Sequence, residues 1–163
     1  MKKNIIIALL AAILALTAYI AVRVSANGSK GNWTLVSDDT VATVYNAVPE
    51  QTNADYVHTA CMYEIDLENI SSLRVLAMER TMMARHGIAY GDIVLIEGAG
   101  RYNGYWRVLD TMNKRFKGQS RIDFLVPNHI KHGRWNNVKV YVPADKKTAD
   151  KAESALSSTQ KQI

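Results

Sequence analysis

Cysteine is nearly absent from the sequence, since Cys61 is the only one in 163 residues. A single cysteine cannot form an internal disulfide, and it cannot supply the thiolate ligands of a structural zinc site. The stability of the fold must therefore come from a packed apolar core. Cys61 lies far beyond the apolar N-terminal run, so it is not placed to carry a lipid, and we interpret it as a small buried residue.

A strong excess of charge of one sign is missing as well. The formal net charge is +5, but three of the 20 basic residues (Lys2, Lys3 and Arg23) belong to the N-terminal segment. The remaining 17 basic and 15 acidic residues leave a net charge of only +2, and they contain no run of lysine or arginine. A surface this weakly basic does not indicate a nucleic-acid partner.

The signatures of common enzyme classes are also lacking. The sequence contains no Gly-x-Gly-x-x-Gly, no P-loop, no His-Glu-x-x-His and no Gly-x-Ser-x-Gly. His129 and His132 are three residues apart and would share one face of a helix, but two histidines alone make a weak case for zinc. We interpret them, together with His58 and His86, as solvated loop residues, and we expect no metal and no cofactor.

The N-terminus carries the features of a membrane-targeting segment. Two lysines precede an uncharged apolar run at residues 5–22, and Val24 and Ala26 supply the small residues that a signal peptidase reads. A run of 18 residues also reaches the lower limit for spanning a bilayer, so residues 1–26 are either a cleaved signal peptide or an anchoring leader helix. Both alternatives place the rest of the chain outside the cytoplasm, in the periplasm, in the cell envelope or secreted.

The remaining chain has room for one domain. Residues 27–40 are polar and contain two glycines, which suits a linker or a loosely bound first strand. Residues 143–163 contain no aromatic residue, so we expect a polar tail that is disordered or a frayed helix, because it lacks an apolar stripe. The folded domain is then expected to span residues 41–142.

Short stretches with the pattern of β-strands dominate this domain. The predicted strands are residues 41–47, 73–78, 92–97, 105–110, 121–126 and 138–142. Residues 80–85 and 127–131 are predicted to form single helical turns. The centre of 92–97 is fully apolar, as expected for a strand that is buried on both faces. Many short strands in one small domain indicate an all-β fold, a barrel or a sandwich.

Two carboxylates stand out among these strands. Asp110 ends one apolar strand, and Asp123 lies between Ile122 and Phe124 in the next. A carboxylate inside an apolar strand is costly unless it is paired, hydrogen-bonded or facing a groove. If both face one groove, their repulsion raises the pKa of one of them, which provides an acid beside a carboxylate, as glycosidic bond cleavage requires. The alternative is a structural pair, with Asp110 capping the following turn and Asp123 bridging to Arg121 or to a loop amide.

The sequence around these residues resembles the three-Asp domain. The segment 108–124 contains Asp-Thr followed by a basic residue, an apolar residue, Asp and an apolar residue, similar to the hallmark of that family. Further similarity lies upstream, to the family's Ala-Thr-x-Tyr, Thr-Ala-Ser-Gly, Ile-Ala-Val-Asp-Pro and Gly-Thr-x-Val-x-Ile segments, at residues 42–45, 59–60, 76–80 and 91–96. The resemblance therefore runs in order across most of the predicted domain.

This resemblance implies a six-stranded double-psi β-barrel, shared with rare-lipoprotein-A-like proteins, expansins and membrane-bound lytic transglycosylase A. It implies a protein that binds or cleaves peptidoglycan or a related glycan, without a metal. Asp123 would protonate the glycosidic oxygen and then accept the proton of the sugar's 6-hydroxyl as that oxygen closes onto C1. Asp110 would tune or orient Asp123. The substrate-binding residues that carry over are Thr43, Tyr45 as a possible sugar-stacking surface, Glu79, Thr111 and Asn113.

The sequence departs from the family at three of these places. Glu79 stands where the family has its first aspartate, Met112 and Asn113 replace two glycines, and Cys61 follows Thr-Ala in place of serine. We expect a monomeric lytic transglycosylase of the cell wall that meets the membrane only through its N-terminal segment. The alternatives are a non-catalytic, expansin-like wall-binding module and a structural protein of an envelope or a phage.

Overall fold

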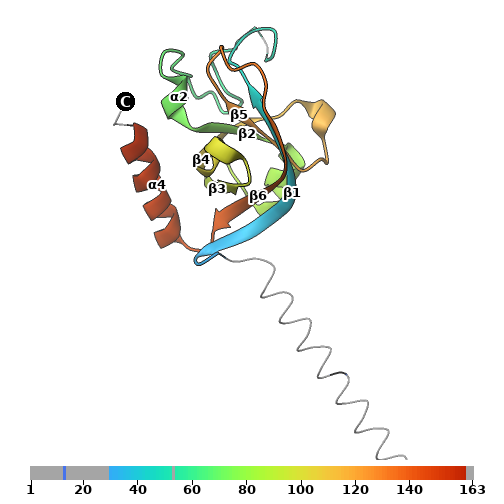
Figure 1. Cartoon of the computed structure of the whole chain (residues 1–163), viewed down its shortest axis with the longest axis vertical. Coiled ribbons are helices and arrows are strands. Elements are labelled where there is room, and N and C mark those ends of the chain that lie inside the picture. The colour runs from blue at the N-terminus through green and yellow to red at the C-terminus, as the bar shows by residue number, and fades with distance from the viewer. Residues whose placement is uncertain (1–12, 14–29, 53, 161–163) are drawn as a thin grey trace, which may run out of the picture.

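Six strands close into a barrel in the computed structural model of the chain, which describes residue 13, residues 30–52 and residues 54–160 (Figure 1). The predicted leader, residues 1–26, lies outside the described residues apart from Ile13. Within the described part, no helix is both long and apolar enough to cross a membrane. The strands are β1 (Trp33–Tyr45), β2 (Val75–Met78), β3 (Ile93–Glu97), β4 (Gly104–Thr111), β5 (Arg121–Leu125) and β6 (Arg134–Pro143). The helices are α2 (Ile70–Leu73), α3 (Arg80–His86) and α4 (Lys146–Gln160), with the short 3-10 helices η1 (Gly100–Tyr102) and η2 (Lys114–Phe116).

The strand order around the barrel is β1-β5-β2-β4-β3-β6, and it closes on itself. Two neighbouring pairs are parallel, β1 with β5 and β2 with β4, whereas the other pairs are antiparallel. Closure leaves no unpaired strand edge, which is the usual solution for a small sheet that has no second sheet to pack against. The prediction of an all-β, six-stranded barrel is therefore confirmed, and the chain's helices are few and short.

Strand β1 begins at Trp33, which pairs with Pro143 of β6, so residues 33–40 form a first strand, the second of the two alternatives for residues 27–40. The helical turn predicted at residues 127–131 was wrong. Residues 127–131 form a hydrogen-bonded turn, in which the Ile130 amide donates to the Pro127 carbonyl at 2.9 Å, and not a helical turn. The Asn46 amide group donates to the carbonyls of Val126, Pro127 and Ile130, and a helix over 127–131 would compete for these acceptors.

The segment predicted as a polar tail also behaves differently, because residues 146–160 form helix α4 along one side of the barrel (Figure 1). Thr148, Ala152 and Leu156 are buried and spaced four residues apart, so they form a narrow buried stripe along one side of the helix. Two of the three side chains are small, and small residues allow the helix to approach the sheet closely. The stripe was missed because it contains only one large apolar residue.

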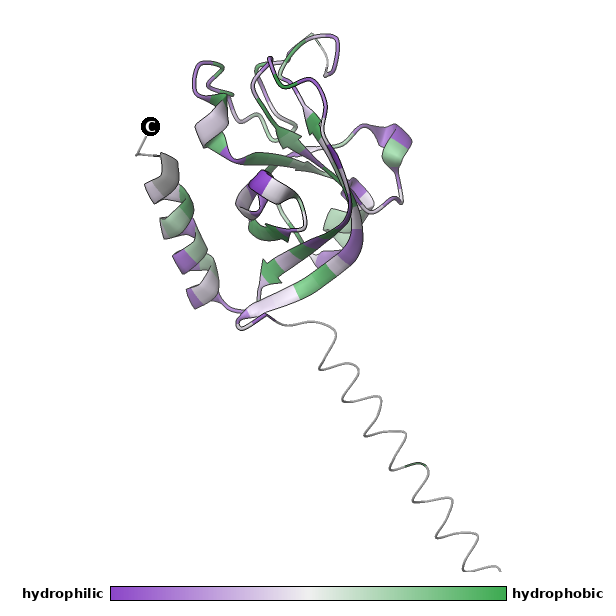
Figure 2. Cartoon of the chain, viewed as in Figure 1, coloured by the Kyte–Doolittle hydropathy of each residue, from purple (hydrophilic) through white to green (hydrophobic). Residues whose placement is uncertain are grey.

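The interior of the barrel is filled by side chains from every strand, and Phe124 lies at its centre against Tyr102, Trp106 and Trp135. In Figure 2 the strands are mostly hydrophobic and the connecting loops mostly hydrophilic. The centre of β3 is apolar on both faces, as predicted, because Val94 and Ile96 face this interior while Ile93 and Leu95 pack in the cluster that includes residues of α4. Each fully buried side chain of this kind contributes about 1.5–3 kcal/mol.

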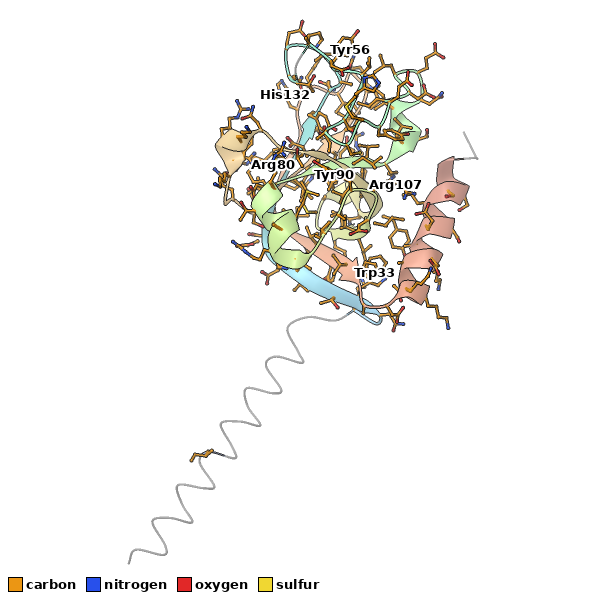
Figure 3. The ribbon with its side chains drawn as sticks, turned by 180° about the vertical axis from the view of Figure 1, so that it is seen from behind. Trp33, Tyr56, Arg80, Tyr90, Arg107 and His132 are labelled. Carbon is orange, nitrogen blue, oxygen red and sulfur yellow. The ribbon has the colours of Figure 1, made fainter. Side chains whose placement is uncertain are left out.

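A second apolar cluster lies on the outside of strands β1, β5, β2 and β4, under the loop of residues 46–69. We call it the outer cluster, and its buried members are Tyr45, Ala47, Ile65, Ile70, Val75, Ala77, Leu109, Met112 and Leu125. The loop and the β5–β6 turn lie at the same end of the molecule, where Figure 3 labels Tyr56 and His132. Several of the predicted site residues lie in or beside the outer cluster.

Candidate functional site

The two aspartates predicted from the sequence lie in one row across four neighbouring strands. Thr43 of β1 is paired with Asp123 of β5, Asp123 with Ala77 of β2, and Ala77 with Asp110 of β4. Residues that are directly opposite in a sheet point to the same face. Ala77 belongs to the outer cluster, so the row lies on the outer face of the barrel, and Ala77 lies between the two aspartates.

Asp110 reaches this face because strand β4 contains a β-bulge. Leu76 pairs with Val108, but the next residue, Ala77, pairs with Asp110, so Leu109 is an extra residue on β4. Val108 faces the interior, and strict alternation would therefore turn Asp110 toward the interior as well. The bulge redirects it onto the outer face, which is a common use of bulges near functional sites.

The carboxyl group of Asp123 is half-buried and accepts a hydrogen bond from the Thr43 hydroxyl. Burial raises its pKa from 3.8 to about 7; the positive charges of Arg121 and Arg115 oppose this rise, and the negative charge of Asp110 adds to it. A carboxyl group with this pKa is present in both its acid and its base form near neutral pH. That is the property required of a residue that first donates and then accepts a proton.

The environment of Asp110 is different, because three donors hold its carboxylate. The Tyr45 hydroxyl donates to Oδ2 at 3.0 Å, and the amides of Ala60 and Thr111 donate to Oδ1 at 2.9 Å and 2.8 Å. The structural alternative for Asp110 was a cap on the turn that follows it. Its bond from the Thr111 amide agrees with that alternative, and the Ala60 amide adds a contact from the loop. Asp123, by contrast, has no ion pair with Arg121 among the described residues.

Tyr45 contributes to the site through its hydroxyl group. Burial raises its pKa well above 10, and the charge of Asp110 and its hydrogen bond to Asp110 raise it further. The hydroxyl therefore remains a donor at physiological pH. The ring is only 9% exposed within the outer cluster, so the structure does not present it as an open surface for stacking against a sugar.

Two of the predicted binding residues, Glu79 and Asn113, cap helices in the structure. Glu79 is the N-cap of α3, and its Oε2 accepts the Met82 amide at 2.9 Å. Burial alone would raise the pKa of Glu79, but hydrogen bonds from several backbone amides, including that of Met82, lower it. Asn113 likewise caps η2 by accepting the Arg115 amide at 3.0 Å. Thr111 stays beside Asp110, and its Oγ1 atom is buried without a hydrogen-bond partner in the described part of the chain.

A short hairpin of the 46–69 loop closes over Asp110, and sequence reasoning did not find it. The Thr59 amide donates to the Tyr63 carbonyl at 3.0 Å, which brings Ala60 onto Asp110. The Cys61 thiol is half-buried and donates to the Leu109 carbonyl at 3.1 Å, so the cysteine fastens the hairpin to the bulge. The family-like Thr59-Ala60 was the only signal for this segment, and a sequence pattern does not show which strand a hairpin contacts.

The two cavities found in the described residues lie elsewhere. One, of about 330 Å³, lies between β1 and α3 and includes Ser37, Glu79 and Ser120; the other, of about 440 Å³, lies beside α4. Neither of these two cavities is lined by Asp110 or Asp123, and both aspartates are half-buried. No group of three metal-binding side chains is present among the described residues.

Comparison of the chain with family models, with curated proteins and with solved structures gives no match in any of the three. The function must therefore be inferred from the geometry of the site.

Proposed function

We propose that this chain is an exported, cell-wall-active protein that cleaves peptidoglycan glycan strands in the manner of a lytic transglycosylase, with Asp123 as its single acid and base. The observation that carries the proposal is the half-buried carboxyl group of Asp123, whose pKa burial raises to about 7 and which lies in one row with Thr43 and Asp110. Its neighbour Asp110 is held by three hydrogen-bond donors. Two carboxyl groups with such different environments are typical of glycosidic bond cleavage.

The reaction requires two proton transfers by one residue. In its acid form Asp123 donates a proton to the glycosidic oxygen, and the bond between that oxygen and C1 breaks. In its base form it then accepts the proton of the sugar's 6-hydroxyl while this oxygen forms a bond to C1. Thr43 fixes the orientation of the carboxyl group through its hydrogen bond. Asp110 lies on the same face of the sheet as Asp123, so its negative charge is near the reacting bond and stabilises the positive charge that develops at C1.

The barrel itself supports a relationship to the three-Asp domain and its double-psi relatives. The chain has two parallel strand pairs within an otherwise antiparallel closed barrel. Asp123 lies on β5 of one parallel pair and Asp110 on β4 of the other. The apolar segment at the N-terminus supports export, since it would place this site on the side of the membrane where peptidoglycan is found.

A non-catalytic wall-binding module is the second candidate. The observation that favours it is the loop after Asp110, where the family has two glycines. Met112 is only 5% exposed and fills the outer cluster, and Asn113 caps η2, so neither position leaves the backbone open to a glycan strand. Such a protein would grip glycans on the same surface without cleaving them.

One experiment separates the two candidates. The full chain in mild detergent, its Asp123→Asn variant and an Asp38→Asn control would be incubated with purified peptidoglycan, followed by mass spectrometry. Asp38 is exposed and lies outside the row, so its variant tests for a general effect of losing a carboxylate. We expect 1,6-anhydro muropeptides from the wild type and the control but not from Asp123→Asn. Binding without products would support the wall-binding module, and the absence of both would contradict both candidates.

A further inference from the structure

Three arginines lie around Asp123, and the proposed reaction gives none of them a task. Arg121 precedes Asp123 by two residues on β5, so both side chains point to the same face. Arg134 of β6 is paired with Thr43, the residue that also pairs with Asp123. Arg115 of η2 acts electrostatically on both Asp123 and Arg121.

Phe116 holds two of these cations together. The Cζ atoms of Arg121 and Arg115 lie 4.1 Å and 4.8 Å from the centre of the Phe116 ring. Each contact with the ring is favourable, but two guanidinium groups on one ring repel each other. Burial lowers the pKa of Arg121; Asp123 opposes this effect, and the charges of Arg134 and Arg115 add to it. Arg115, Arg121 and Arg134 therefore give this site an excess of positive charge.

These arginines lack a directly ion-paired carboxylate among the described residues. The Nε atom of Arg121 is buried and has no hydrogen-bond partner among the same residues. The three guanidinium groups therefore lie close together without an ion-paired carboxylate in this part of the chain.

We propose that Arg115, Arg121 and Arg134 form an anion subsite that receives a carboxylate carried by the glycan strand next to the bond at Asp123. This inference rests on the proposed function, because it names the kind of strand that the same surface accepts. The planar guanidinium fork matches the two oxygens of a carboxylate, and Arg115 and Arg134 are exposed, so a strand outside the chain can reach them. A neutral glycan would leave the three cations unpaired, so the site prefers an acidic strand.

The test compares one polymer in two charge states. Soluble peptidoglycan strands are first freed of phosphate-bearing polymers, and half of the material is then amidated at its carboxyl groups with a carbodiimide and ammonia. Binding to the full chain in mild detergent is measured in the Asp123→Asn background, so that no strand is cleaved. We expect the unmodified strands to bind about tenfold more tightly than the amidated ones, with a preference that weakens as salt is added.

The variants decide whether the arginines cause this preference. Arg115→Gln and Arg121→Gln are each expected to reduce the preference, measured as the ratio of the two affinities, at least threefold, and Arg121→Lys should restore part of it. Arg115 is exposed, so its variant tests the subsite even if Arg121→Gln folds poorly. Arg85→Gln, on α3, is the matched control and should keep the full preference.

Three results would overturn the subsite: equal binding of both strands, a preference that survives in both arginine variants, or one that appears only with phosphate-bearing strands. The outcome remains separate from that of the proposed function. Anhydro products without a charge preference leave the catalytic proposal standing and remove the subsite. A preference that depends on the arginines, without anhydro products, does the reverse.

Discussion

Asp110 and Asp123 have the same side chain, and their surroundings give them different chemistry. Asp123 has Thr43 as its hydrogen-bond donor and is desolvated by the outer cluster's surface, so its pKa is about 7. Asp110 has three donors, two of them backbone amides. The charge of each group acts on the other, and this coupling leads to a prediction at the scale of single residues.

Removing the charge of Asp110 should lower the pKa of Asp123. Because the acid form of Asp123 is needed for the first step, the activity of the wild type should fall as the pH rises above about 7. In Asp110→Asn the fall should begin at a lower pH, by up to about one unit. Arg115→Gln should move it the other way, since the charge of Arg115 lowers this pKa. Carboxyl chemical shifts recorded by NMR over a pH series would check both directions, and equal shifts of the same sign would contradict the account.

The raised pKa of Asp123 also has a cost in stability. The folded state keeps the proton up to about pH 7, whereas the unfolded state releases it near pH 3.8, so stability falls as the pH rises between these values. The cost is at most about 1.4 kcal/mol for each unit of pKa difference. We therefore expect Asp123→Asn to gain stability over the wild type from pH 4 to pH 7, with a constant difference above pH 7. Urea unfolding at several pH values measures it, and a difference that is independent of pH would argue against a buried ionisable Asp123.

The sequence pointed to the two aspartates more clearly than to the residues around them. Asp123 and Asp110 were found because a charge within an apolar strand is conspicuous. Glu79 was grouped with them, since a helix cap and a ligand look alike in a sequence, and only the Met82 amide shows which one it is. Arg121 was considered only as a partner for Asp123. The sequence does not show that Arg115 lies near Arg121, because that proximity depends on how η2 folds against the barrel.

Among the elements, helix α4 differs most from the sequence prediction, which was a polar tail at residues 143–163. Its stripe packs on Trp33, Ile93 and Tyr141, and Arg107 of β4 donates to Glu153 at 2.5 Å and 2.8 Å. Figure 3 shows Arg107 between the barrel and α4. The strands under the helix carry the large side chains, so the helix needs only small ones, and a search for an apolar stripe within one segment does not detect such a pairing.

If α4 stabilises the barrel, then Leu156→Ala should be costly. Leu156 is 3% exposed, and removing three carbons from such a site typically costs about 2–4 kcal/mol. Lys151→Ala on the exposed side of the same helix should change the free energy of unfolding by less than about 0.5 kcal/mol. Chemical denaturation of both variants measures this difference. Equal stabilities of the two variants would mean that the helix adds little to the fold.

The elements of the barrel were easier to predict, because alternation of apolar and polar residues has a simple physical cause. The bulge in β4 was not foreseen, because one extra residue leaves the pattern of Val108, Leu109 and Asp110 unchanged in the sequence. Only pairing with β2 shows that Asp110 turns outward. Strand β1 was predicted too short for a similar reason, since the pairing with β6 orders residues that are polar by themselves.

On the scale of the whole molecule, the barrel separates stability from function. Its interior is a continuous apolar core, α4 covers one outer side, and the 46–69 loop covers part of another. The row of Thr43, Asp123 and Asp110 lies beside that loop, on the outer face of strands that the core holds rigid.

The origin of the oxygen in the product tests this account most directly. A lytic transglycosylase closes the 6-oxygen of the sugar onto C1, so no atom of solvent enters the product. When the full chain cleaves peptidoglycan in water enriched in ¹⁸O, we predict 1,6-anhydro products without ¹⁸O at the new end, in the wild type but not in Asp123→Asn. Products that carry ¹⁸O, or anhydro products that persist in Asp123→Asn, would contradict the role assigned to Asp123.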